Sequence, residues 1–163
     1  MKSDTIISYV LLIVVIICCL FLNQYLLNNT VVENFYQNNS QNNDVTFYFF
    51  SMKGCPHCTN VDSSGEFTKL ANEYSPKEVN NRNVFAKNIE ISRTNNNNTD
   101  VYFRNSSGER IPGTEAQAKK IYDKCKNKIS GYPSFLLIKD GNIVQYDSGR
   151  DYNSFTTFIN NNV

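Results

Sequence analysis

The sequence predicts an α/β domain with one mixed β-sheet covered by helices on both faces, preceded by one N-terminal transmembrane helix. Three observations lead to this fold class. Residues 5–27 are uncharged and largely apolar, residues 28–43 are mostly polar, and residues 44–163 alternate between strand-like and helix-like apolar patterns. A strand–helix–strand order requires a parallel pair of strands, and a hairpin near the C-terminus adds antiparallel ones.

Residues 5–27 form the predicted transmembrane anchor, behind a short tail of residues 1–4. No charged residue occurs between Asp4 and Glu33, and a helix needs about 20 residues to cross the hydrocarbon core. A cleaved signal peptide is the alternative, but its apolar region should be shorter and followed by small residues. The cysteines of this run, Cys18 and Cys19, are interpreted as apolar residues, with palmitoylation as the minor alternative.

The charges that flank the anchor predict its orientation. Lys2 and the α-amino group precede it, whereas Glu33 and Asp44 follow it, and positive charge tends to stay on the cytoplasmic side. We therefore expect a single-pass membrane protein with a cytoplasmic N-terminus and a lumenal or extracytoplasmic folded domain. The Asn-rich residues 28–43 are predicted to form a stalk that holds this domain, residues 44–163, off the bilayer.

The first half of the domain should contain a strand, an interrupted helix and a second strand. Residues 44–51 are a β-branched and aromatic run without a helical stripe, which indicates a buried strand. A helical segment follows the next cysteines and extends to Tyr74, with a kink or break expected at Gly65. Pro76 ends the helix. Residues 83–92 alternate imperfectly between apolar and polar and are predicted to form the second strand.

The second half should contain a helix, a hairpin and a final helix. The stretch after an Asn-rich loop, residues 101–111, has no clear pattern. A capping box from Thr114 to Gln117 opens the helix, and Asp140 with Gly141 is a strong signal for a two-residue hairpin turn. The predicted elements are a helix from 114 to about 129, strands at 135–138 and 143–146, and a helix at 151–161.

The stretch KGCPHCTN, residues 53–60, places two cysteines where the first strand leads into the first helix. With Cys55 at the N-cap, Pro56 occupies the first helical position, where its missing N–H costs nothing. Cys55 then faces the free N–H groups and the positive end of the helix dipole, which favours a thiolate. Cys58 lies one turn further along the same side. His57, the single histidine, can add a positive charge or a hydrogen bond that favours this thiolate.

Other interpretations of the pair are weaker. A zinc site needs four ligands, and beyond the pair only His57 and Cys125 are candidates, so no metal site is predicted. A structural disulfide would close too small a loop to restrain the chain, and a chance pair would leave its placement unexplained. Cys125 lies on the apolar stripe of a predicted helix and is interpreted as a core residue, with a third redox thiol as the alternative. The net charge of +1 indicates no nucleic-acid partner.

Three segments together resemble the thioredoxin superfamily: CPHC after the strand FYFF, GYPSFLLIKDGN, and YDSGRDYNSFTTFI. The resemblance covers about Asp44 to Asn161. GYPSF and the Gly-Arg-Asp entry to the last helix are most similar to protein disulfide isomerase domains, whereas the Pro-His dipeptide is similar to bacterial periplasmic disulfide oxidants. The resemblance implies that Pro133 forms a cis peptide bond beside the dithiol and that Tyr132 offers backbone hydrogen bonds to an extended substrate. An ordinary trans proline in an edge strand is the alternative.

Two positions depart from the pattern of this superfamily. Such domains usually have Trp before the first cysteine, and many have a buried acid six residues before it. This chain has Gly54 and Phe49 there. Deprotonation of Cys58 therefore lacks its usual helper.

The predicted function is that of a membrane-anchored thiol–disulfide oxidoreductase. The redox-active Cys55–Cys58 disulfide would act without a further cofactor, on cysteine-containing protein substrates and with a redox recycling partner. The alternative function is that of a non-catalytic binding module that presents the cis-proline surface to a partner. A metal-binding dithiol is a minor third possibility. The predicted site consists of Cys55 as nucleophile, Cys58 as resolving thiol, His57 as the residue that tunes Cys55, and Pro56, Tyr132 and Pro133 as the substrate surface.

Overall fold

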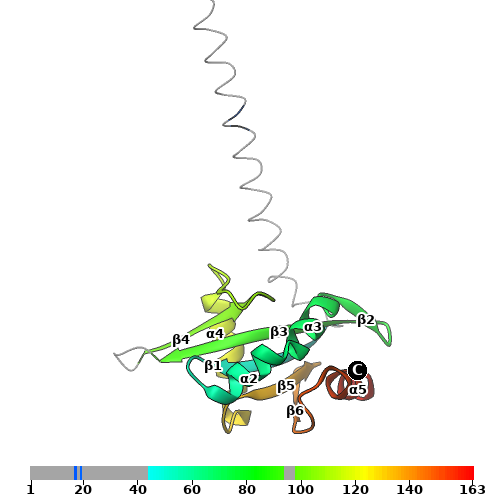
Figure 1. The fold of residues 1–163 in the computed structure, drawn as a ribbon. Coiled ribbons are helices and arrows are strands. Elements are labelled where there is room, and N and C mark those ends of the chain that lie inside the picture. Colours follow the sequence, from blue (N-terminus) through cyan, green and yellow to red (C-terminus); the bar gives the residue numbers. More distant parts are fainter. Residues whose placement is uncertain (1–16, 18, 20–43, 94–97) are drawn as a thin grey trace, which may run out of the picture. The chain divides into compact units, whose positions relative to one another are not determined.

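The structure is a computed structural model that describes Ile17, Cys19 and residues 44–93 and 98–163 (Figure 1). Among these residues, no helix is long and apolar enough to cross a membrane. The predicted stalk, and all of the predicted anchor except Ile17 and Cys19, lie outside the described residues.

The domain alternates strands and helices in the predicted order, with two additional strands. Its elements are β1 (Val45–Met52), α2 (Pro56–Ser64), α3 (Glu66–Glu73), β2 (Lys77–Val79), β3 (Arg82–Arg93), β4 (Thr99–Arg104), α4 (Glu115–Cys125), a 3₁₀ turn (Lys126–Lys128), β5 (Ser134–Lys139), β6 (Asn142–Tyr146) and α5 (Tyr152–Asn162).

The strands form one mixed sheet in the order β2-β3-β1-β5-β6, and β4 also pairs with β3. β1 and β3 are parallel, whereas β1–β5 and β5–β6 are antiparallel. The predicted mixed sheet is therefore confirmed. The carboxyl ends of β1, β3 and β6 and the amino end of β5 lie at the same edge of the sheet. The cysteine pair follows β1 at this edge.

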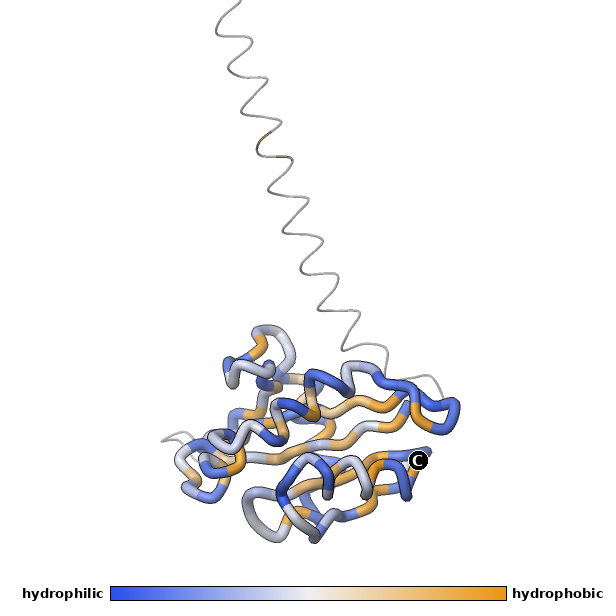
Figure 2. Tube along the Cα trace, turned by 45° about the vertical axis from the view of Figure 1, so that its right-hand side comes forward, coloured by the Kyte–Doolittle hydropathy of each residue, from blue (hydrophilic) through white to orange (hydrophobic). Residues whose placement is uncertain are grey.

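Helices cover both faces of the sheet, as predicted. α2, α3 and α5 pack on one face and α4 on the other (Figure 1). β3 is therefore buried on both sides: Val84 and Ala86 face the α2–α3–α5 side, and by strand alternation Ile89 and Ile91 face the opposite side. This double burial explains the imperfect alternation of its sequence. Figure 2 shows the same arrangement, with hydrophobic residues concentrated in the strands.

Two short strands were not predicted. β4 pairs antiparallel with the end of β3 and buries Val101 and Phe103 opposite Ile91 and Ile89. Tyr102 between them is also buried, so the apolar residues of β4 form one run of three, too short to show an alternating strand pattern. β2 spans three residues and pairs with the beginning of β3.

Thr114 is the N-cap of α4, so the predicted start of this helix is confirmed. The predicted capping box is wrong in one respect, because the Thr114 side chain makes no cap hydrogen bond. Its hydroxyl instead donates to the Ile111 carbonyl (2.7 Å) and accepts from the Phe103 N–H (3.4 Å), so it ties the preceding loop to β4. The helix also ends earlier than predicted: Cys125 is its last residue, the next three form the 3₁₀ turn, and Ile129 is extended.

The break in the first helix is confirmed at Gly65, which separates α2 from α3 with a left-handed φ of 73°. Gly65→Ala should lower the free energy of unfolding by about 1 kcal/mol, because a Cβ is strained at this φ although no atom lies within 4 Å of it. Denaturant unfolding of the full chain measures this difference. Gly131→Ala, where the space is also open and φ is not left-handed, is the matched control. Equal losses of stability from the two substitutions would contradict a left-handed backbone at Gly65.

Candidate active site

Cys55 occupies the N-cap of α2, as predicted. Its backbone is extended (φ −81°, ψ 116°), and Pro56 follows at the start of the helix. The backbone N–H groups of Cys58 and Thr59 both donate to the Cys55 carbonyl at 3.1 Å. The side chain of Cys55 therefore lies at the amino end of the helix, where the free N–H groups favour a negative charge.

The two thiols differ in exposure and acidity. Cys55 is half-buried and Cys58 is 3% exposed, and both are free thiols in this structure. A hydrogen bond from the Cys58 side chain lowers the pKa of Cys55 against the opposing effect of desolvation, with further help from the backbone N–H groups of Cys58 and His57 and the charge of Arg150. Burial, followed by the hydrogen bond to Cys55, raises the pKa of Cys58 to about 12. The pair thus combines an accessible, acidic thiol with a buried, protonated one.

The loop before β5 lies against Cys55. The Tyr132–Pro133 peptide bond is cis, which confirms the predicted cis-proline and excludes the trans alternative. The Cys55 thiol donates to the Tyr132 carbonyl across 3.6 Å. Ser134 Oγ donates to the Gly131 carbonyl at 2.6 Å and stabilises the loop. The structure therefore brings together residues that lie 77 positions apart in the sequence.

The two departures from the superfamily pattern have local explanations. Gly54 has a φ of 78°, which an L-residue with a side chain rarely adopts. Phe49 is fully buried, with ring centroids 5.0 Å from those of Phe67 and Phe135. The position that holds an acid in many such domains is thus part of the aromatic core.

An ion-pair network joins α2, the helix that carries the two cysteines, to β4 and β3. Asp62, one turn after Cys58, pairs with Arg104 at 2.8 Å, and Arg104 also pairs with Glu90 at 3.2 Å. The guanidinium is held in addition by the Gly108 carbonyl at 2.9 Å. The negative charge of Asp62 helps to raise the pKa of Cys58. The pairing of Asp62 with Arg104 could not be predicted from the sequence, because it depends on the unpredicted strand β4.

The side chain of His57 is exposed, as is that of Pro56. The contribution of His57 to the Cys55 thiolate in this structure comes from its backbone N–H. An effect of its imidazole stays a prediction.

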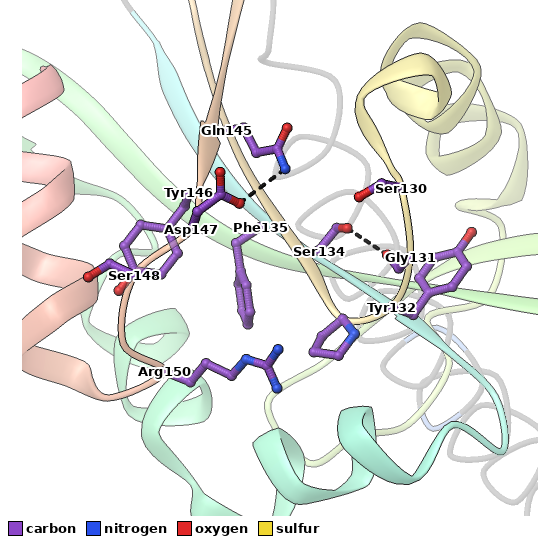
Figure 3. A pocket seen from close by; sticks show the side chains of 11 residues that line it. Ser130, Gly131, Tyr132, Ser134, Phe135, Gln145, Tyr146, Asp147, Ser148 and Arg150 are labelled. Atoms are coloured by element: carbon purple, nitrogen blue, oxygen red, sulfur yellow. Dashed lines mark hydrogen bonds between the residues drawn. The ribbon is translucent and has the colours of Figure 1, made fainter.

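A pocket of about 320 Å³ opens beside the cis-proline loop (Figure 3). Arg150 extends from the loop after β6 toward the start of β5. At another part of the pocket, Asp147 accepts a hydrogen bond from the Gln145 amide at 3.0 Å. Arg150 is a site residue that the sequence reasoning missed, although it stands in the Gly-Arg-Asp entry to the last helix. The lining includes Ser130, Tyr132, Pro133, Gln145, Asp147 and Arg150.

Cys125 is fully buried, which confirms its prediction as a core residue. Burial raises the pKa of its thiol to about 11. In the described part of the chain, no group of three His, Cys, Asp or Glu side chains could hold a metal ion.

The sheet order, the dithiol at the start of α2 and the cis-proline before β5 define a thioredoxin-like fold. Among solved structures, the chain is similar to the first thioredoxin domain of mouse protein disulfide-isomerase A4, with 19% identity, a TM-score of 0.44, and coverage of 80% of this chain and 68% of that one. It is also similar to the J-Trx1 fragment of ERdj5, with 18% identity, a TM-score of 0.40, and coverage of 74% and 43%. Human ERp44 in its zinc-bound form matches with 16% identity, a TM-score of 0.41, and coverage of 79% and 28%.

The chain therefore spans less than half of the ERdj5 fragment and of ERp44. No protein-family model and no curated protein sequence matches it.

The difference in acidity predicts selective alkylation. In the full chain, iodoacetamide should modify Cys55 at and below about pH 8.5, the ordinary thiol pKa, because a lowered pKa keeps the thiolate present until the pH falls through the shifted value. Cys58 and Cys125 should stay unmodified under the same conditions, since burial raises their pKa values. Peptide mapping by mass spectrometry measures each site. Equal modification of Cys55 and Cys58 would contradict the assigned roles.

Proposed function

We propose that this chain is a thiol–disulfide oxidoreductase that acts on protein cysteines through Cys55 and Cys58. The observation that carries the proposal is the asymmetry of the pair: an accessible thiol with a lowered pKa stands at a helix N-terminus, one turn from a buried thiol with a raised pKa. A purely structural pair would not need this difference. A binding module would not need an accessible thiol beside the cis-proline loop.

In the oxidising direction, a substrate thiolate attacks the Cys55 sulfur of the Cys55–Cys58 disulfide. The S–S bond breaks, Cys58 leaves with the electron pair and takes up a proton, and Cys55 is joined to the substrate. A second substrate thiolate then attacks the substrate sulfur of this mixed disulfide and releases Cys55 as a thiolate. Two electrons pass from the substrate to the protein. In the reducing direction the same steps run backward, and Cys58 must lose its proton.

The acidity of Cys55 favours the oxidising direction. A stable Cys55 thiolate is a good leaving group and stabilises the reduced protein, which makes the disulfide a stronger oxidant. Three features disfavour the reverse reaction. The pKa of Cys58 is raised to about 12, Phe49 stands at the position that holds an acid in many such domains, and the Asp62 carboxylate is engaged by Arg104.

The substrate would lie along the cis-proline loop. The Tyr132 carbonyl, which accepts from the Cys55 thiol in this structure, becomes available to a substrate N–H when Cys55 enters a disulfide. Pro56 and His57 follow Cys55 in the chain, are exposed, and complete the surface we propose for substrate binding.

An exchange assay tests the proposal. The oxidised full chain should oxidise a reduced two-cysteine test protein repeatedly when a small disulfide is supplied, and Cys55→Ser should abolish this activity. Cys125→Ala, checked for folding by circular dichroism, is the matched control and should retain it, because Cys125 is buried in the core. If Cys55→Ser were as active as the wild type, the enzyme proposal would be lost, and an inactive wild type would favour the binding module.

We further propose that residues 5–27 anchor the chain in a membrane, with the dithiol domain on the lumenal or extracytoplasmic side. The support is the uncharged apolar run between Asp4 and Glu33 and the position of Lys2 before it. In cells, the chain should resist alkaline carbonate extraction, and its C-terminal domain should be protected from protease in sealed vesicles. Release by carbonate would contradict the anchor, and digestion in intact cytoplasmic-side-out vesicles would contradict the orientation.

A further inference from the structure

The arginines of the domain divide into two groups. The sequence contains five, and three of them make ion pairs: Arg82 with Asp140, Arg104 with Asp62 and Glu90, and Arg110 with Asp100 and Glu115. Within residues 44–93 and 98–163, Arg93 and Arg150 form no ion pair. A surface arginine without a counter-ion is available to an acidic ligand.

Both of these arginines stand at the sheet edge that carries the dithiol. Arg93 ends β3, two residues after Ile91, whose carbonyl accepts from the Lys53 N–H at 2.9 Å. Arg150 follows β6 and lines the pocket with Tyr132 and Pro133 (Figure 3). Across this edge the order is therefore Arg93 on β3, the dithiol after β1, the cis-proline before β5, and Arg150 after β6.

The charges of both arginines act on residues of the site. The hydrogen bond from Cys58 lowers the pKa of Cys55, and Arg150 adds to this effect. Burial raises the pKa of the Tyr132 phenol, and the charge of Arg93 acts in the opposite direction. Acids close to them in the sequence or at the site have other partners: Asp62 pairs with Arg104, Asp147 accepts a hydrogen bond from Gln145, and Asp151 caps α5 by accepting from Ser154.

The spacing suits an extended polypeptide. β3 and β6 are three strand spacings apart, about 14 Å, a distance that about four residues of extended chain span. A chain lying across the edge with its cysteine at Cys55 would bring residues on either side of that cysteine under the two guanidinium groups.

We propose that this site selects cysteines of acidic polypeptide segments, with Arg93 and Arg150 binding carboxylates that flank the reacting cysteine on its two sides. This inference rests on the proposed function. Each exposed charge pair changes an association rate by about two- to fivefold, so two pairs together distinguish acidic from basic segments by about tenfold or more at low salt. Added salt screens the preference.

Three synthetic two-cysteine peptides test the proposal. They differ only in the residues that flank the cysteines, which are Glu, Gln or Lys, and each is given in reduced form to the oxidised full chain. The Glu peptide should be oxidised about tenfold faster than the Lys peptide at low salt, with the Gln peptide between them. In Arg93→Gln/Arg150→Gln the ratio should fall to about one. The ratio is compared rather than the absolute rate, because Arg150 also acts on Cys55.

The matched control is Lys120→Gln/Lys124→Gln, which removes the same charge from exposed positions of α4 on the other face of the sheet. It should retain the preference for the Glu peptide. Equal rates for the three peptides with the wild type, or a preference that persists in the double arginine variant, would overturn the inference and leave the proposed function standing. Oxidation of none of the peptides would instead overturn the proposed function.

Discussion

Cys58→Ser should convert the protein into a covalent trap for its substrates. Cys55 would still attack a substrate disulfide, because its place at the amino end of α2 and the backbone N–H groups that favour its thiolate are unchanged. The mixed disulfide could not be resolved from within the protein, since serine cannot displace the substrate sulfur. Turnover should therefore be lost, while a protein–substrate adduct accumulates on non-reducing gels and disappears on reduction.

Two control variants, Cys55→Ser and the double variant Cys55→Ser/Cys58→Ser, show whether the adduct depends on Cys55. Cys55→Ser and the double variant should form no adduct, because Cys58 is only 3% exposed and its pKa is raised to about 12. Loss of the hydrogen bond from Cys58 should also raise the pKa of Cys55 in Cys58→Ser, so adduct formation should be slower near neutral pH than at higher pH. An adduct of equal yield in Cys55→Ser would reverse the assigned roles of the two cysteines.

Phe47→Ala should lower the free energy of unfolding by about 3–5 kcal/mol. The ring is fully buried at the centre of an aromatic cluster, and its removal leaves a cavity that rigid neighbours cannot fill. Denaturant unfolding of the full chain measures the loss. The ring centroids of Phe155, Tyr146, Phe158, Phe135 and Phe67 lie 5.6, 5.8, 5.8, 6.1 and 6.3 Å from that of Phe47.

Phe47→Leu is the matched control, because it keeps most of the volume and should cost about 1.5 kcal/mol or less. A loss below about 1 kcal/mol for Phe47→Ala would show that this cluster does not form the core. Phe47 lies in β1, the strand that precedes Cys55. Phe47→Ala should therefore also lose exchange activity as the domain unfolds.

Much of the fold could be predicted because its strongest signals are local. The aromatic run of β1, the glycine that divides α2 from α3, and the Asp140–Gly141 turn each act over a few residues. β4 could not be predicted, because Val101 and Phe103 are buried only by pairing with β3, across a loop. The hydrogen bonds of the Thr114 hydroxyl could not be predicted for a related reason. The hydroxyl bonds to β4 and to the preceding loop instead of to the N–H groups at the start of α4.

The candidate site divides in the same way. Cys55, Pro56 and Cys58 belong to one short motif, and the resemblance placed Pro133 beside them, so sequence reasoning reached all four. Arg150 and Arg93 were not found, because a surface arginine without an ion pair looks in a sequence like one that has a partner. The three-dimensional positions of acids such as Asp62 and Asp140 are needed to tell the paired arginines from Arg93 and Arg150.

A redox titration of the full chain tests whether Cys55 and Cys58 form a redox-active pair. The protein is equilibrated in glutathione buffers of increasing oxidising strength, the free thiols are blocked, and peptide mapping reports the state of each cysteine. We expect one reversible two-electron transition that joins Cys55 to Cys58, while Cys125 stays reduced throughout. A pair that never forms a disulfide, or one that stays oxidised against millimolar reduced glutathione, would contradict it.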